Sequence, residues 1–295
     1  MLTRGAHSAA LRARYAGGRM RTAVYGAFSK GIYLQTPEGR LILLHDREIG
    51  LIPFGIAVSG FVRGVIAEMA LRPGMEGAFD NGRLTFLQCP VVIALQEEPV
   101  PGVSPLIPAA QERKQRMALW ESRLIEQGNS AVLPLLNDAL EDNPFTSIAR
   151  GPLDALCHAL CAGQQAQIHA ALLELIGLGI GLTPSLDDFL DGLMYTLCFS
   201  QRNWGQTLPG TGYLAGAVQS LAGSRTNPYS AAYLVSAAAG ERFSVLEDFL
   251  DGQDFLSDAA GENLLKIGSS SGADMMCGMI LALRLLELPK GRPNG

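Results

Sequence analysis

A hydroxyl, a carboxylate and a glycine recur at the same spacing in two stretches of this chain. The pattern Ser-x-x-Asp-x-x-x-Gly comprises Ser185, Asp188 and Gly192 in the first stretch and Ser271, Asp274 and Gly278 in the second. A serine at an N-cap with an acidic residue three positions later is close to the capping box that opens many helices. The glycine lies one turn beyond the aspartate on the same face, where it would let another backbone approach closely. The spacing therefore predicts two helices, each with a hydroxyl and a carboxylate near its start.

Further small residues surround both predicted helix starts. They are Gly179, Gly181, Thr183 and Asp187 around the first start, and Ser269, Ser270 and Gly272 around the second. Capping alone does not require them. Backbone amides at a helix N-terminus, exposed by neighbouring glycines, form a binding site for an anion such as phosphate or carboxylate. We therefore expect the two helix starts to face each other across one anion-binding pocket. The alternative is two well-capped buried helices with no ligand.

A third polar segment, "GSRTNPYS", lies between the two stretches in sequence. Its Arg225 can bind a carboxylate or phosphate through two parallel hydrogen bonds, and Thr226 and Asn227 can donate or accept hydrogen bonds. An ordinary helix start, capped by Ser224 or Asn227, explains the same residues equally well. Together with the other two stretches, this segment predicts a hydroxyl-rich pocket that contains one cation.

The elements that must position these residues fall into two groups. From about Thr22 to Leu95 short apolar runs alternate with turns such as "PEGR" and "FDNGR", which predicts strands and hairpins. The proline-rich segment "QEEPVPGVSPLIPAAQ" is typical of a linker, and helical patterns follow it. We expect an α+β protein with a barrel-like, β-rich domain over residues 22–107 and a mainly helical domain over 108–290. Residues 1–21, which carry arginines but no acid, are expected to be disordered or to form an extension, and a transit-like segment is the alternative.

The overall composition excludes several classes of protein. A formal net charge of -5 argues against a surface dedicated to nucleic acid or anionic membranes, which needs concentrated Lys and Arg. No apolar stretch approaches the roughly 20 residues that span a bilayer. The five cysteines are scattered and odd in number, which favours a reducing cytoplasm over a disulfide framework. We expect a cytoplasmic protein.

Familiar cofactor and metal motifs fail in this sequence. The stretch "GLGIG" would need its third dinucleotide-binding glycine at the position of Leu182. Cys157, His158 and Cys161 lack a second pair of zinc ligands, so we interpret them as core residues. No cofactor and no metal site is therefore expected. The one alternative is a Mg²⁺ ion with a phosphate ligand, held by Asp187, Asp188 and Asp191. Asp191 is otherwise expected to face solvent.

Three segments of the chain together resemble a known bacterial family. They are "LIGLGIGLTPSLDDFLDGL", "RTNPYSAAYLVSAAAGE" and "IGSSSGADMMCGMI", and the looser resemblance extends over about residues 22–288. The family is that of the AllH-type subunit of oxamate carbamoyltransferase. This chain departs from the family pattern at Ile180, where proline is usual, at Leu186, where glycine is usual, and at Asn227, where threonine is usual.

The resemblance implies transfer of a carbamoyl group from carbamoyl phosphate to oxamate, giving oxalurate and phosphate, in anaerobic allantoin or purine breakdown. It also implies an oligomeric complex with FdrA-like and AllG-like subunits. Asp188 or Asp274 would accept a proton or orient its acceptor. The residues expected to bind the small anionic substrate are Gly179, Gly181, Thr183, Ser185, Asp187, Arg225, Thr226, Asn227, Ser270, Ser271 and Gly272. Two alternatives stay open, namely a noncatalytic scaffold subunit of the complex and an independent enzyme acting on another small anion or phosphate ester.

Overall fold

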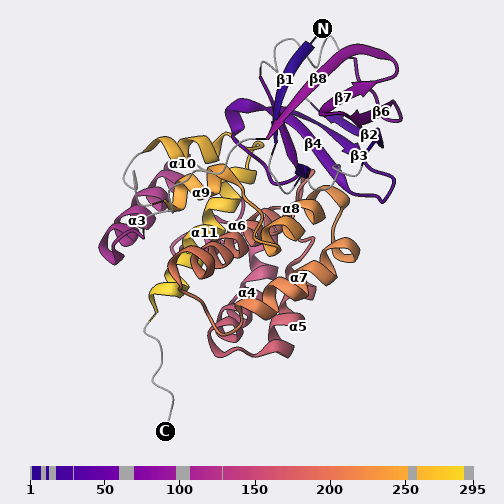
Figure 1. Ribbon diagram of the computed structural model, residues 1–295. Helices are drawn as coiled ribbons and strands as arrows, with labels where there is room; N and C mark the ends of the chain where they lie inside the picture. Colours follow the sequence, from indigo (N-terminus) through magenta and orange to yellow (C-terminus); the bar gives the residue numbers. More distant parts are fainter. Residues whose placement is uncertain are drawn as a thin grey trace. The chain divides into compact units, whose positions relative to one another are not determined.

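The computed structural model of the protein divides into two compact units (Figure 1). The first comprises Met1–Val103 with Glu241–Glu247, and the second comprises Ser104–Gly240 with Asp248–Gly295. The structure describes residues 2–7, 11–12, 18–28, 30–59, 70–97, 107–127, 129–251 and 258–288. Residues 98–106 of the predicted linker lie outside the described residues, so the predicted domain boundary there stays a prediction.

The first unit contains a closed barrel of eight strands, in the order β1-β5-β4-β3-β2-β6-β7-β8. The strands are β1 (Leu2–His7), β2 (Met20–Phe28), β3 (Gly31–Gln35), β4 (Leu41–Asp46), β5 (Gly55–Val58), β6 (Glu76–Asp80), β7 (Arg83–Phe86) and β8 (Cys89–Glu97). Strands β1 and β8 pair in parallel, as do β4 and β5, and the other pairs are antiparallel. Apolar side chains from these strands fill the interior and form one buried core. This architecture confirms the predicted barrel-like, β-rich part of an α+β fold.

Local turn chemistry explains why the strands meet as hairpins. Asn81 and Gly82 connect β6 to β7 with positive φ angles of 47° and 69°, as a two-residue hairpin loop requires. Gly39, with φ of 80°, turns the chain between β3 and β4 in the predicted "PEGR" segment. Both turns confirm the hairpins that the sequence predicts.

The beginning of the chain differs from the sequence-based expectation. Residues 1–21 were expected to form an extension, but Leu2–His7 is strand β1 and pairs with β5 on one side and β8 on the other. Without β1 both neighbouring strands would present unpaired backbone groups, so the barrel gains its closure from this strand. That requirement comes from the assembled sheet, and a six-residue segment rich in small and polar residues gives little local sign of it.

The second unit is helical. Its helices among the described residues are α3 (Ala110–Gln127), α4 (Pro144–Ala162), α5 (Gln165–Leu175), α6 (Ser185–Phe199), α7 (Thr211–Arg225), α8 (Pro228–Ala238), α10 (Asp258–Leu265) and α11 (Ser271–Glu287), while α9 (Ser244–Leu250) belongs partly to each unit. Every residue of α6 except Cys198 is buried, as are most residues of α11. These two helices therefore form the centre of the helical unit. No helix in the described ranges is long and apolar enough to cross a membrane.

Helices α6 and α11 lie side by side and cross at very short range (Figure 1). A Cβ atom added to Gly192 of α6 would lie 2.0 Å from the carbonyl oxygen of Met275. A Cβ atom added to Gly278 of α11 would lie 1.9 Å from the carbonyl oxygen of Phe189. Each glycine thus contacts the residue that follows the aspartate of the other helix. The two copies of the repeated pattern pack against each other reciprocally, which confirms the close backbone approach predicted for these glycines.

Candidate active site

The reciprocal crossing brings the two predicted catalytic aspartates together. Asp188 and Asp274 are 3% and 0% exposed. Burial raises the pKa of Asp188 well above its ordinary value, and the neighbouring charge of Asp274 raises it further. The hydroxyl of Thr183 donates a hydrogen bond to Oδ2 of Asp188 at 2.8 Å and lies 3.1 Å from the hydroxyl oxygen of Ser271. The starts of the two helices therefore form one polar cluster.

The serines of the repeat do not cap their own helices, which corrects the sequence-based prediction. Ser185 and Ser271 are the first residues of α6 and α11, and the N-cap residues, Pro184 and Ser270, make no side-chain capping hydrogen bond. Instead, Ser271 acts as a hydrogen-bond donor that lowers the pKa of Asp188 on the other helix. Ser185 and Ser270 likewise lie close enough to Asp274 to lower its pKa. Ser185, Asp188 and Asp274 are buried, so the helix crossing sets which groups they contact.

Asp274 is suited to proton transfer near neutral pH. Burial is the main cause that raises its pKa to about 6. Ser130, in the segment between α3 and the short 3₁₀ helix η3 (Leu133–Leu135), donates a hydrogen bond to Oδ1 of Asp274 at 2.7 Å. Oδ2 is buried and has no hydrogen-bond partner within the described parts of the chain. A carboxylate with a pKa near the working pH and one unoccupied acceptor atom matches what general base catalysis needs.

Ser130 was missed by the sequence analysis. It lies outside both copies of the repeat and 144 positions from Asp274. The only local signal is the polar pair Asn129–Ser130, which follows the end of a predicted helix and precedes an apolar run. Such pairs are common at helix ends, so only the packed structure identifies this one as a neighbour of the aspartate.

Asp187 lies on a different side of α6 and joins the third polar segment to the cluster. The amide of Gly177 donates to its Oδ1 at 2.7 Å, and the hydroxyl of Thr226 donates to its Oδ2. One turn further along α6, Asp191 is 2% exposed, and burial together with the charge of Asp187 raises its pKa to about 8. The prediction that Asp191 faces solvent is therefore wrong. Of the three aspartates of "DDFLD", Asp187 and Asp188 accept hydrogen bonds from different residues, and Oδ2 of Asp191 has no partner among the described residues.

The remaining residues of the third segment have structural contacts. Asn227 caps α8, since its side-chain oxygen accepts hydrogen bonds from the amides of Tyr229 and Ser230. Its amide group also donates to the carbonyl oxygen of Leu182 at 2.9 Å, which ties the glycine-rich loop to α8. Arg225 is exposed at the end of α7, and its guanidinium donates to the carbonyl oxygen of Leu173 at the end of α5. The guanidinium of the predicted cation thus binds a backbone carbonyl oxygen in this structure.

The glycine-rich loop, residues 177–183, packs on the start of α6 and accepts a hydrogen bond from a backbone amide there. The amide of Leu186 donates to the carbonyl oxygen of Leu178 at 3.1 Å, and the next two amides donate to Pro184. Gly179 has a φ of 129°, and a Cβ there would lie 2.5 Å from the amide nitrogen of Ser185. Gly181, with φ of 105°, lies in the exposed part of the same loop. An anion at these amides would therefore require the loop to move.

The start of α11 is similarly closed. The amide of Gly272 donates to the carbonyl oxygen of Ile267 at 3.1 Å, and a Cβ on Gly272 would lie 1.9 Å from the carbonyl oxygen of Leu264. Gly272 therefore serves close packing between α10 and α11. In the described ranges, no group of three or more His, Cys, Asp or Glu residues is arranged to hold a metal ion.

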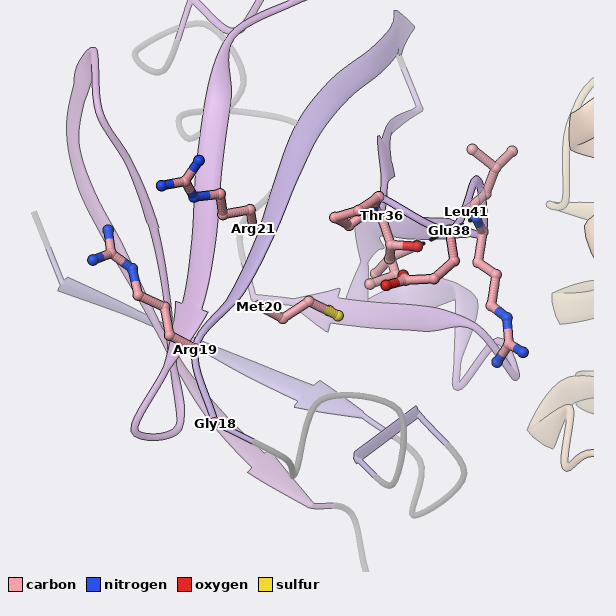
Figure 2. A pocket seen from close by; sticks show the side chains of 10 residues that line it. Gly18, Arg19, Met20, Arg21, Thr36, Glu38 and Leu41 are labelled. Atoms are coloured by element: carbon pink, nitrogen blue, oxygen red, sulfur yellow. Dashed lines mark hydrogen bonds between the residues drawn. The ribbon is translucent and has the colours of Figure 1, made fainter.

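A cavity of about 580 Å³ lies in the first unit, at the start of β2 and the β3–β4 turn. Figure 2 shows the Met20 side chain pointing toward Thr36 and Glu38, whereas the guanidinium groups of Arg19 and Arg21 point away from them. The lining of this cavity also includes Arg40, beside Leu41 and Ile42. The cavity lies outside the segments that carry the repeated pattern, so the starts of α6 and α11 remain the candidate site.

Comparison with known proteins gives one match, which covers part of the helical unit. No curated protein and no solved structure matches the chain. Residues 175–283, which contain α6, α7, α8 and most of α11, match the family described as oxamate carbamoyltransferase subunit AllH. This region includes both copies of the repeat and the third polar segment. Residues 175–283 of the chain are thus similar to the AllH-type family.

Proposed function

We propose that this chain is a catalytic subunit of an oxamate carbamoyltransferase, and that the joined starts of α6 and α11 bind its substrate. One observation carries the proposal. Within the region that matches the family, two buried carboxylates adjoin each other, and Oδ2 of Asp274 has no partner among the described residues. The complex would also contain FdrA-like and AllG-like subunits, and it would act in anaerobic allantoin or purine breakdown.

The reaction requires a base at the nitrogen of oxamate. This amide nitrogen attacks the carbonyl carbon of carbamoyl phosphate, a carbon–nitrogen bond forms, and the bond from that carbon to the phosphate oxygen breaks. An amide nitrogen is a poor nucleophile, so it must lose a proton as the new bond forms. Asp274, with its raised pKa of about 6, is ionised at neutral pH and is a stronger base than an ordinary aspartate. The proton would pass to its Oδ2, and phosphate would leave with the bonding electrons.

The electrostatics of the cluster favour one orientation of the substrates. Asp188 and Asp274 raise each other's cost of ionisation, so the negatively charged ends of the substrates would be repelled by them. The N–H groups of oxamate and of the carbamoyl group would instead face the carboxylates. The hydroxyls of Thr183 and Ser271 donate to Asp188 in the closed structure. Once the glycine-rich loop opens, they would be free to donate to the oxygen that becomes negative in the tetrahedral intermediate.

Access to the aspartates requires a local opening of the chain, because they are almost fully buried. The glycine-rich loop is the element that covers the start of α6, and Ile180 within it is 68% exposed. Its movement would break the hydrogen bond from Asn227 to Leu182 and the contact between Thr183 and Ser271. Binding energy from the substrates or from a partner subunit would drive this opening.

Turnover by the complex reconstituted with its partner subunits tests the proposal. Asp274→Asn should lower kcat about 100- to 10,000-fold, the usual contribution of a general base. Asp188→Asn, which alters the other carboxylate of the cluster, should also lower kcat. Asp154→Asn, at an exposed position of α4, serves as the matched control and should retain wild-type kcat. Near-normal turnover in both site variants would exclude these carboxylates from the chemistry.

A noncatalytic scaffold subunit is the second candidate. It is favoured by the protein contacts that close the starts of α6 and α11. In that case the repeat would only hold α6 and α11 together. Calorimetry on the isolated chain with carbamoyl phosphate, oxamate and phosphate separates the two candidates. Heat of binding that disappears in Asp274→Asn supports a substrate site in this subunit, whereas the absence of heat with all three compounds favours the scaffold.

A further inference from the structure

Ser130 makes three contacts that fix the direction of its hydroxyl proton. The oxygen accepts a hydrogen bond from the amide of Val132 at 3.3 Å, and it lies 3.4 Å from the sulfur of Cys277. The amide can only donate, and the buried Cys277 keeps its S–H proton because burial raises its thiol pKa to about 12. The hydroxyl of Ser130 therefore donates its proton to Oδ1 of Asp274, 2.7 Å away.

This hydrogen bond makes the two oxygens of Asp274 unequal. Protonation at Oδ1 would remove an acceptor from Ser130, whereas Oδ2 accepts no hydrogen bond from any residue that the structure describes. Incoming protons therefore favour Oδ2.

We propose that Ser130 is a positioning residue, which holds Oδ1 of Asp274 so that Oδ2 receives the proton from the substrate's amide nitrogen. This inference rests on the proposed function and assigns a role to a residue outside both copies of the repeat. The sulfur of Cys277 contacts the hydroxyl of Ser130, and Cys277 has no direct part in the reaction.

The pH dependence of kcat/KM in the reconstituted complex tests this role. Ser130→Ala removes a donor that lowers the pKa of Asp274, so the acid limb of the profile should move upward by about one pH unit. Ser130→Thr keeps the hydroxyl and should restore the wild-type limb. Ser220→Ala removes an exposed hydroxyl on α7 that donates to the carbonyl oxygen of Ala217, and it should leave the profile unchanged. An acid limb that does not move in Ser130→Ala overturns the proposal.

Infrared difference titration of the full-length chain without substrate gives a second readout. Asp274→Asn identifies the carboxyl band, and Ser130→Ala should raise the pH at which this band titrates. If Ser130→Ala does not fold, Ser130→Cys provides the same test, because the thiol fills a similar volume but is a weak donor. An unchanged band overturns the role of Ser130 even when Asp274→Asn abolishes turnover. Full turnover in Asp274→Asn overturns instead the proposed function, and this role with it.

Discussion

Asp187 and Asp188 are neighbours in sequence, but their carboxylates lie on two different sides of α6. On one side, both oxygens of Asp187 accept hydrogen bonds, from Gly177 and Thr226. On the other side, Asp188 meets Asp274, one oxygen of which has no partner in the described part of the chain. All three are buried, so burial does not distinguish them. The comparison teaches that a carboxylate with both oxygens occupied holds the fold, whereas one with an unoccupied oxygen can exchange a proton.

The largest effect is expected at Asp191, which lies on the side of Asp187 but does not have both oxygens occupied by residues that the structure describes. Asp191 lies on the same side as Asp187, yet its Oδ2 is buried without a partner among the described residues. Its pKa rises from 3.8 to about 8, so the folded state binds more protons than the unfolded state between these values. Stability therefore falls as the pH rises across that window.

Asp191→Asn removes this titration. Between pH 5 and pH 8 the variant should gain about 4 kcal/mol of unfolding free energy relative to wild type. Urea unfolding at both pH values measures the change, and Asp154→Asn should follow wild type. If the difference in unfolding free energy between Asp191→Asn and wild type is the same at pH 5 and pH 8, Asp191 is ionised at both pH values.

The second effect concerns the close crossing of α6 and α11. Gly278→Ala places a Cβ 1.9 Å from the carbonyl oxygen of Phe189, which forces the helices apart. We expect a loss of about 3 kcal/mol in the free energy of unfolding, at the upper end of overpacking costs. Gly216→Ala, in α7 with no atom within 4 Å of the added Cβ, is the control and should stabilise by roughly 0.5–1 kcal/mol. Equal effects of the two substitutions would contradict the close crossing.

The third prediction compares Thr226, which donates to Asp187 on one side of α6, with Thr183, which donates to Asp188 on the other. Thr226→Val leaves Oδ2 of Asp187 buried without its donor, and we expect a loss of about 2 kcal/mol in unfolding free energy. Thr183→Val, beside Asp188, should lower kcat more strongly than stability. Denaturant unfolding and turnover of both variants give the comparison. The opposite ranking would reverse the roles assigned to the two sides of α6.

The smallest effect is expected at the cap of α8. Asn227→Ala removes the cap and the hydrogen bond to Leu182, and it should cost about 1 kcal/mol. Because this hydrogen bond ties down the glycine-rich loop, amide hydrogen exchange within residues 177–183 should become faster. Unchanged exchange there, despite the lost stability, would mean that Asn227 does not restrain the loop.

Much of the fold could be predicted because helix and hairpin signals are local. Two hairpin turns, the helical second unit and the close approach at Gly192 and Gly278 all follow from residue types at short spacing. The period of a helix places an aspartate and a glycine four residues apart on one face, whatever the rest of the chain does. Strand β1 was missed because its pairing partners lie far away in sequence.

The candidate site was predicted in its residues but less well in their contacts. Ser185 was expected to cap its own helix, yet it lies beside Asp274 on the other one. Arg225 was expected beside the acids, yet it binds a carbonyl oxygen of α5. Asp191 was expected in solvent and is buried. Each difference concerns the partner of a side chain, and a partner distant in sequence leaves no trace in local spacing.

Residue spacing along the chain sets which side chains lie near the starts of two similar helices, because it fixes the helix face on which each of them lies. The reciprocal crossing of these helices, in which the serine of each repeat approaches the other's aspartate, comes from tertiary packing. Packing also brings Ser130 to one oxygen of Asp274 and leaves the other without a donor in the described residues. Burial and hydrogen-bond saturation depend on contacts between residues that are distant in sequence, and short-range periodicity does not encode these contacts.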